Sequence, residues 1–210
     1  MVNQFFVKAD VVDITNDSPQ AADQFFVDTN AWEFLTYIPV SLSPITPKPY
    51  QVRDYPNYIK HALKSRSRLY RCGLSFSELS SLIEFKRCAN FLHKVPDKRE
   101  LKYFRHNNPI ERAGVVAEIQ SRWLDITQFS EDLSLTIDDV LINRSLNLIG
   151  NVQVDMYDLF YVEAMALAGL TQIITDDADF VTIPGITVFT SNRNAIELAR
   201  SQGKLSLIHI

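Results

Sequence analysis

The segment Gln24-Phe25-Phe26-Val27-Asp28-Thr29-Asn30 decides the fold, because a short apolar run in it leads directly into an acidic residue. We predict a strand over residues 24–27 and a short helix over residues 30–37, where apolar side chains return at mixed spacing. A carboxylate at the point where a strand gives way to a loop or a helix is well placed for the active site of an α/β protein. Asp28 is therefore the first candidate functional residue.

Short apolar runs alternate with helical patterns along most of the remaining chain, which predicts an α/β fold with a mainly parallel sheet. Gly150 and Gly169 follow two helical patterns, in the position where glycine commonly ends a helix. The predicted helices cover residues 58–69, 75–92, 109–129, 138–148, 158–168 and 194–200. The other predicted strands cover residues 5–7, 133–137, 172–175, 186–189 and 205–210, the first of them at an edge of the sheet.

The composition is that of a folded globular protein. At 210 residues, with 46% hydrophobic and 22% charged residues, the chain is long enough for a full core. A net charge of −4 does not favour nucleic-acid binding, although a basic face can coexist with an acidic site. Cys72 and Cys88 are predicted to be reduced thiols, and neither a signal peptide nor a membrane span is evident. We therefore expect a cytoplasmic protein without membrane contacts.

The domain organisation predicted from these patterns is a lead-in over residues 1–23 and one domain over residues 24–210. Four prolines between residues 39 and 50 break any regular element there. We interpret residues 39–73, which hold this loop and the basic helix after it, as an insertion. Residues 94–130 are predicted to form an extended helical region.

Four acidic residues lie where the pattern predicts a strand end or a helix start: Asp28, Glu78, Asp158 and Asp177. The ends of parallel strands meet at one edge of a sheet, so we expect these carboxylates to converge on one pocket. Carboxylate oxygens are the ligands that Mg²⁺ and Mn²⁺ prefer. A site of this kind commonly handles phosphate chemistry, because the cation neutralises the anionic oxygens of a phosphodiester.

The chain resembles the PIN-domain family, which includes the VapC-like toxin ribonucleases, in four segments that occur in the family's order. These are Val27-Asp28-Thr29-Asn30, Ser75-Phe76-Ser77-Glu78-Leu79, the Ala-rich stretch from Asp158 to Gly169, and Thr175-Asp176-Asp177-Ala178-Asp179-Phe180. The resemblance covers roughly residues 24–190. The stretches between Asn30 and Glu78 and between Glu78 and Asp158 are long for a minimal member of the family.

The resemblance implies a PIN-like α/β/α sandwich with a mainly parallel central sheet and helical insertions. It also implies a metal-dependent endoribonuclease that uses Mg²⁺ or Mn²⁺. The implied catalytic and metal-binding residues are Asp28, Glu78, Asp158 and Asp177, with Asp179 as a secondary ligand. Asn30 and Thr175 are expected to orient water or a carboxylate.

Several of these positions have a purely structural alternative. Ser75 and Glu78 match a capping box, in which Ser75 would cap the helix and Glu78 would serve the helix start. Asp155 precedes Asp158 by about one helical turn and competes with it as the functional acid. Asp176 is expected to face solvent, because the register favours Asp177 as the ligand.

The expected partners are an RNA substrate, an antitoxin protein if the chain is a toxin, and a second copy of the chain. Lys60, Lys64 and Arg68 on the basic helix become phosphate contacts if that helix faces the acidic pocket, and are otherwise a solvated face. A non-catalytic PIN-like module that binds RNA or protein is the alternative function. A haloacid-dehalogenase-like phosphatase requires Asp-x-Asp, whereas this chain has Asp28-Thr29-Asn30.

Overall fold

The central sheet of the protein contains seven strands in the order β4-β3-β2-β5-β6-β1-β7 in the computed structural model, which describes residues 6–206. All strand pairs in this part of the chain are parallel, which confirms the predicted α/β class and is consistent with a PIN-like α/β/α sandwich. The strands are β1 (Asp10–Asp13), β2 (Gln24–Val27), β3 (Arg68–Cys72), β4 (Glu131–Leu133), β5 (Gln172–Ile174), β6 (Thr187–Thr190) and β7 (Leu205–Ser206).

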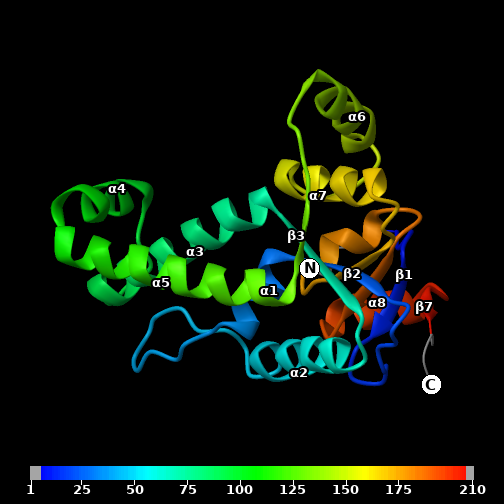
Figure 1. Ribbon diagram of the computed structural model, residues 1–210, viewed down its shortest axis with the longest axis horizontal. Coiled ribbons are helices and arrows are strands. Elements are labelled where there is room, and N and C mark those ends of the chain that lie inside the picture. The colour runs from blue at the N-terminus through cyan, green and yellow to red at the C-terminus, as the bar shows by residue number, and fades with distance from the viewer. Residues whose placement is uncertain (1–5, 207–210) are drawn as a thin grey trace.

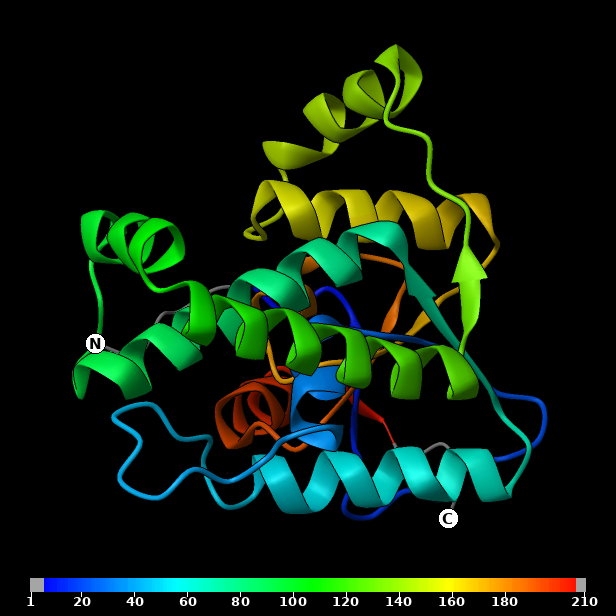
Figure 2. The same cartoon turned by 60° about the vertical axis from the view of Figure 1, so that its left-hand side comes forward.

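Helices cover both faces of this sheet (Figures 1 and 2). They are α1 (Thr29–Leu35), α2 (Gln51–Lys64), α3 (Gly73–Leu92), α4 (Lys98–Asn107), α5 (Pro109–Phe129), α6 (Asp139–Ile149), α7 (Met156–Leu167) and α8 (Arg193–Ser201), with a 3₁₀ helix η1 at Ala178–Thr182. Alternation along β2 divides the core, because successive side chains of a strand point to opposite faces. Phe26 packs with the layer that contains α7 and α8, while Phe25 and Val27 pack with the layer of α1, α2, α3 and α5.

Two helical projections extend beyond this sandwich. Helices α3, α4 and α5 form an arm that leads away from the sheet, and α6 stands outside α7 (Figure 1). Pro109 at the first position of α5 starts that helix, which ends at Phe129 as predicted. Asp138 caps α6 by accepting from the backbone N–H of Leu141 at 2.9 Å, and Gly150 follows its end. The extended helical region predicted at residues 94–130 therefore corresponds to α4 and α5.

The N-terminal prediction was wrong in its boundaries. No strand occupies the described part of residues 5–7, and Phe5 lies outside the described residues. The first strand is instead Asp10–Asp13, which pairs with β6 on one side and β7 on the other. Residues 1–23 are thus more than a lead-in, because they contribute a fully integrated strand of the sheet. The last predicted strand, at 205–210, is observed as Leu205–Ser206, and its remainder lies outside the described residues.

The predicted insertion at residues 39–73 was also wrong in part. The Pro-rich loop is present, but β3 at Arg68–Cys72 is a strand of the central sheet between β2 and β4. Helix α2 covers Gln51–Lys64 rather than residues 58–69. It ends where Arg66 adopts a left-handed backbone conformation with φ of 66°, which no α-helix can continue. The strand predicted at residues 133–137 lies earlier in the chain, at Glu131–Leu133, where it pairs with β3.

No helix formed by residues 6–206 combines the length and the apolar character that crossing a membrane requires.

Candidate metal centre

Strand order brings three of the predicted acids to one edge of the sheet. Strands β3, β2 and β5 are neighbours and run parallel, so their carboxyl ends lie side by side. Asp28 directly follows β2, Asp177 follows β5 by three residues, and Glu78 lies on α3, which begins at the end of β3. Asp158 comes from the first turn of α7, whose Tyr161 ring packs against Phe26 of β2 with centroids 5.2 Å apart.

Asp28 is the most firmly held acid of this group. It is 3% exposed and caps α1 by accepting from the backbone N–H of Thr29 at 2.6 Å. The hydroxyl of Thr175 donates to its other oxygen at 2.6 Å, and the amide of Asn30 donates to the same oxygen. Because Thr175 follows β5, these bonds tie the start of α1 to the neighbouring strand. Asn30 and Thr175 therefore both contact the Asp28 carboxylate.

Glu78 is linked to Asp28 through a tyrosine. The Tyr161 hydroxyl donates to Glu78 Oε2 at 2.7 Å, and lies 3.1 Å from the hydroxyl of Thr29, which adjoins Asp28. Glu78 is not part of a capping box with Ser75, so this alternative was wrong. Helix α3 begins at Gly73, and the Ser75 hydroxyl accepts instead from the Cys72 N–H at 3.4 Å. Glu78 lies in the second turn of α3, on the exposed side of that helix.

Asp155 and Asp158 share the start of α7. Asp155 is the capping residue and accepts from the N–H groups of Tyr157 at 2.8 Å and Asp158 at 3.0 Å. Burial raises the pKa of Asp158 to about 8, with further increases from the negative charges of Asp28 and Asp155, and smaller ones from Asp177 and Glu78. Asp155 is therefore the cap of α7, and its charge acts on Asp158, the candidate that the sequence ranked above it.

Asp177 and Asp179 lie at the start of η1. The Asp177 N–H donates to Thr175 Oγ1 at 2.9 Å, and Asp177 Oδ1 accepts from the Asp179 N–H at 2.8 Å. Burial raises the pKa of both carboxyls, and the charge of Asp155 raises both further. The Asp177 charge also raises the pKa of Asp179. Asp179, the predicted secondary ligand, is therefore influenced by the charges of both Asp177 and Asp155.

These acids form one electrostatic unit, which we call the acidic cluster: Asp28, Glu78, Asp155, Asp158 and Asp177. Burial raises the pKa of Asp28 to about 7, and the charge of Glu78 is the next largest cause, ahead of that of Asp177. Within residues 6–206, no Lys or Arg forms an ion pair with any member of the cluster. Its negative charge is thus uncompensated by the described chain.

The chemistry of the cluster fits a hard divalent cation, which prefers carboxylate oxygens and would relieve their mutual repulsion. As they stand, however, no three His, Cys, Asp or Glu side chains among the described residues are arranged to hold a metal ion. Glu78 is exposed and Asp158 is half-buried, whereas Asp28 is fixed by three hydrogen bonds. Among these candidate ligands, Asp28 is therefore the one whose carboxylate is held in a fixed direction.

Asp176 does not face solvent, in contrast to the prediction. It is half-buried and accepts from the hydroxyls of Tyr55 at 2.8 Å and Tyr50 at 3.1 Å, and from the amide of Gln51. Burial, followed by the charge of Asp176, raises the pKa of both tyrosines, so that they remain protonated donors. The Asp176 N–H donates to Asn30 Oδ1 at 3.0 Å, which connects the start of α2 to the residue that holds Asp28.

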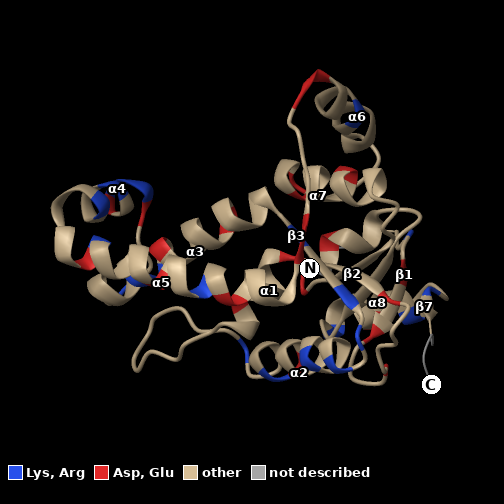
Figure 3. Ribbon diagram, viewed as in Figure 1, with Lys and Arg blue, Asp and Glu red and all other residues tan. Residues whose placement is uncertain are grey.

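The predicted RNA contacts on the basic helix lie toward the opposite edge of the sheet. Helix α2 starts at the bonds to Asp176 and runs antiparallel to the strands, so Lys64 at its end lies at the amino edge. There the Ser67 hydroxyl donates to the Gln20 carbonyl at 2.8 Å. Arg68 starts β3 and pairs with Glu131 at 2.6 Å. Figure 3 shows the basic residues distributed along α2. Lys60, Lys64 and Arg68 thus do not face the acidic cluster.

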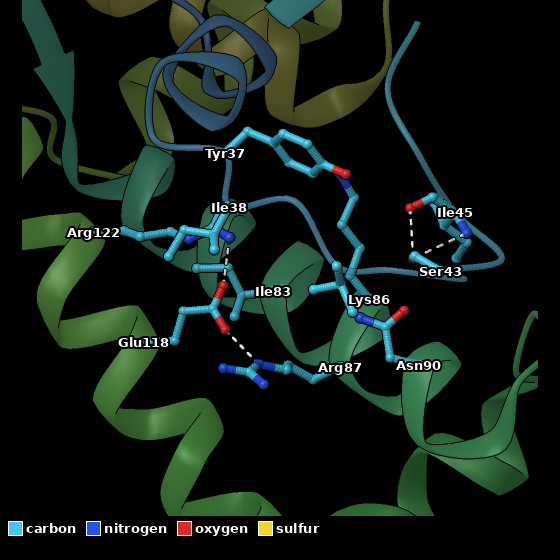
Figure 4. A pocket seen from close by; sticks show the side chains of 11 residues that line it. Tyr37, Ile38, Ser43, Ile45, Ile83, Lys86, Arg87, Asn90, Glu118 and Arg122 are labelled. Atoms are coloured by element: carbon cyan, nitrogen blue, oxygen red, sulfur yellow. Dashed lines mark hydrogen bonds and ion pairs between the residues drawn. The ribbon is translucent and has the colours of Figure 1, made fainter.

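A separate cavity of about 50 Å³ lies beneath the loop before α2 and shares no lining residue with the acidic cluster. Glu118 in its wall pairs with the guanidinium groups of Arg87 and Arg122 (Figure 4). Lys86, also in the wall, donates to the buried carboxylate of Glu33 at 2.7 Å. Glu33 and Glu118 thus each have a cationic partner, and these ion pairs indicate that the charged groups of this cavity stabilise the fold.

Tyr161 and Asp155 are the residues of this region that sequence patterns understated. Asp155 had a usable signal, because aspartate is a preferred capping residue immediately before a helix. Tyr161 had no local signal, since its contact with Glu78 joins residues 83 positions apart. Comparison of the chain with protein-family models and with curated protein sequences finds no match in either.

Proposed function

We propose that this protein is a metal-dependent endoribonuclease that hydrolyses RNA phosphodiesters at the acidic cluster. The observation that supports this best is the delivery of Asp28, Glu78 and Asp177 by three adjacent parallel strands to one edge, with Asp158 coupled to them. A group of acids without any cationic partner costs stability, and such arrangements cluster at functional sites. The resemblance of the four segments to PIN-domain ribonucleases agrees with this proposal.

The chain's own residues supply orientation and charge. Thr175, Asn30 and the Thr29 N–H fix the Asp28 carboxylate, so its direction is set before any ligand arrives. Tyr161 holds Glu78 from the other side. Mg²⁺ or Mn²⁺ bound among these oxygens would neutralise the phosphate and lower the pKa of a bound water. The catalytic and metal-binding set proposed is Asp28, Glu78, Asp158 and Asp177, with Asp179 secondary.

A toxin of a toxin–antitoxin pair is the biological role that the PIN resemblance suggests. In that case we expect an antitoxin segment to place a basic side chain at the acidic cluster, where it would compete with the metal. Arginine suits this position best, because its planar guanidinium binds a carboxylate in a bidentate manner.

A non-catalytic PIN-like module that binds RNA or protein is the second candidate. The observation that favours it is the lack of any ligating arrangement of three acids or histidines among the described residues. The two candidates differ in one outcome, because the module binds its partner without metal-dependent cleavage.

The deciding experiment is RNA cleavage with Mg²⁺ or Mn²⁺, with and without a chelator. We expect cleavage by the wild-type chain, its loss on chelation, and a decrease of about 100-fold or more in Asp28→Asn. Asp138→Asn is the matched control, because Asp138 also caps a helix but lies on α6, outside the acidic cluster. RNA binding without cleavage under any of these conditions would establish the non-catalytic module.

A further inference from the structure

A groove of about 420 Å³ lies along the arm, between α3, α4 and α5. We call it the α3 groove; its lining includes Phe76, Ser77, Ser81, Glu84, Arg105 and Arg112. Figure 3 shows basic residues gathered on α4, which supplies Arg105 to the groove. Neither the sequence patterns nor the proposed chemistry assigns a role to these residues.

The two arginines leave the groove with a surplus of positive charge. Both pair with the same carboxylate, that of Glu84, which is 6% exposed. Arg105 donates to it through Nε at 2.9 Å and through Nη2, and Arg112 donates through Nη1 at 2.6 Å. One negative charge thus faces two positive charges. The arginine side chains remain 49% and 38% exposed, so their other N–H groups are open to a ligand.

This anchoring suits recognition of a phosphate. A guanidinium has five N–H donors in a fixed plane, and Glu84 occupies only some of them. Because the carboxylate holds both side chains in place, a ligand would not pay the full entropic cost of ordering them. Arginine held in this way is a preferred partner of phosphate groups.

The α3 groove lies on the helix that also carries Glu78, although Glu78 does not line it. Ser81 lines the groove and neighbours Glu78 on the exposed surface of α3, at three residues' distance. Glu84 lies six residues beyond Glu78, which is about 9 Å along a helix axis. A chain that leaves the acidic cluster along α3 therefore reaches the two arginines within a short span.

Phe76 adds an aromatic surface to the groove. It is 43% exposed, and its ring meets the edge of Trp123 at 5.1 Å, which fixes its orientation. A positioned aromatic ring beside arginines is a feature of surfaces that bind single-stranded nucleic acid, because a base can stack on the ring while phosphates contact the cations.

We propose that the α3 groove binds the single-stranded RNA that flanks the scissile bond, with Arg105 and Arg112 on a backbone phosphate and Phe76 beneath a base. This inference rests on the proposed ribonuclease function. It locates the RNA path on the arm, on the opposite side of the acidic cluster from the α2 lysines. Charge complementarity, the exposed ring of Phe76 and the short distance along α3 to Glu78 are the features that favour RNA as the occupant.

The test measures RNA affinity of the full-length chain in the Asp28→Asn background, so that substrate is not consumed. The variant Glu84→Gln/Arg105→Gln/Arg112→Gln removes both cations without leaving a buried charge unpaired. Its matched control is Lys64→Gln, which changes the net charge by the same amount at the other edge of the sheet. Arg112→Gln alone retains the Arg105–Glu84 pair and serves if the triple variant fails to fold, as judged by thermal unfolding.

For a single-stranded RNA of about ten nucleotides, we expect the triple variant to bind on the order of tenfold more weakly, and Arg112→Gln by a smaller factor. The slope of log affinity against log salt should decrease by about 0.7 for each phosphate that the variant no longer neutralises. Lys64→Gln should change neither quantity. Equal RNA affinity and salt slope in the groove variants and Lys64→Gln would overturn the inference, as would binding of a polyglutamate peptide in preference to RNA.

The outcome separates this inference from the proposed function. Metal-dependent cleavage by the wild-type chain, without any response of affinity to the groove variants, refutes the groove and leaves the ribonuclease intact. Groove-dependent RNA binding without cleavage under any metal condition refutes the ribonuclease and supports the groove as the surface of an RNA-binding module.

Discussion

Acidic side chains occur in two settings in this protein, and the two settings differ in their cationic partners. Glu33, Glu84 and Glu118 each face at least one cationic side chain on the helical layer and its arm. The acidic cluster at the carboxyl edge of the sheet has no such partner among the described residues, and burial and like charges raise the pKa of Asp28 and Asp158. The difference indicates that the first set stabilises the fold, whereas the second set is maintained at a cost to stability.

The first prediction contrasts one acid from each setting. Glu33→Gln should lower the free energy of unfolding by about 3 to 5 kcal/mol, because Lys86 loses its carboxylate partner and the 6% exposed Arg122 keeps only Glu118. Asp158→Asn should raise it at pH 9 by about 2 kcal/mol, allowing for solvent screening of a half-buried group, because a repelled charge is removed. Denaturant unfolding in the presence of a chelator measures both.

Asp158→Asn is a suitable test because the Asp158 carboxylate accepts no hydrogen bond from residues 6–206, whereas the backbone N–H that donates to Asp155 is unchanged by the substitution. At pH 3 the carboxyl is mostly protonated in both the folded and the unfolded wild type, so the variant and the wild type should then have nearly equal stability. A variant that is less stable than wild type at pH 9 would show that Asp158 contributes to the fold as Glu33 does.

The second prediction concerns the pH dependence of the metal-free protein. The pKa of Asp28 is about 7 in the folded state and near 3.8 when unfolded, so between these values the folded state retains a proton that the unfolded state has lost. Stability from this group is therefore fully present below pH 3.8 and is lost as pH rises through 7. The loss should be on the order of 4 kcal/mol.

Unfolding in chelator at intervals from pH 4 to pH 9 measures this slope. In Asp28→Asn the slope should be shallower, since the titrating group is absent. Addition of Mg²⁺ at pH 8 should raise the melting temperature of the wild type, because the ion binds the ionised form. Stability that rises with pH over this window would contradict the assignment of Asp28 to a self-repelling cluster.

The third prediction, with the smallest expected effect, compares the stability changes caused by substituting two helix caps. Asp155 and Asp138 both accept from N–H groups at a helix start, on α7 and α6 respectively. Asparagine caps a helix about as well as aspartate, so Asp138→Asn should change stability by only a few tenths of a kcal/mol. Asp155→Asn should stabilise the metal-free protein at pH 8 by about 0.5 to 1 kcal/mol, because its charge opposes ionisation of Asp158 and Asp177. Equal melting temperatures for the two variants would place Asp155 outside the cluster.

Local signals were sufficient for elements whose ends are set by their own residues. Pro109 starts α5, and Asp138 and Gly150 flank α6, all as the sequence predicts. The same kind of local signal gave the wrong start for α3. The Ser75–Glu78 pattern satisfies a capping box, but pairing of β3 with β2 and β4 draws the chain into a strand up to Cys72, and the helix then begins at Gly73.

The position of Asp176 and the extent of α2 were decided by distant contacts. Tyr50 and Tyr55 reach Asp176 across more than 120 residues, and this contact sets where α2 begins. A periodic pattern reports which side of a helix is apolar, but it contains no information about partners far along the chain. For this reason the sequence predicted the basic character of this helix but left open whether it faces the acidic cluster.

The sequence by itself determined the α/β class, because short apolar runs alternate with helical patterns, and it identified the acids that follow strands. Only the tertiary structure decided that β3 separates β2 from β4, that Tyr161 joins Glu78 to the vicinity of Asp28, and that Asp155 shares the field of Asp158. The physical reason is that hydrophobic periodicity is a local property, whereas strand order, hydrogen bonds between distant residues and like-charge repulsion depend on which segments meet in space.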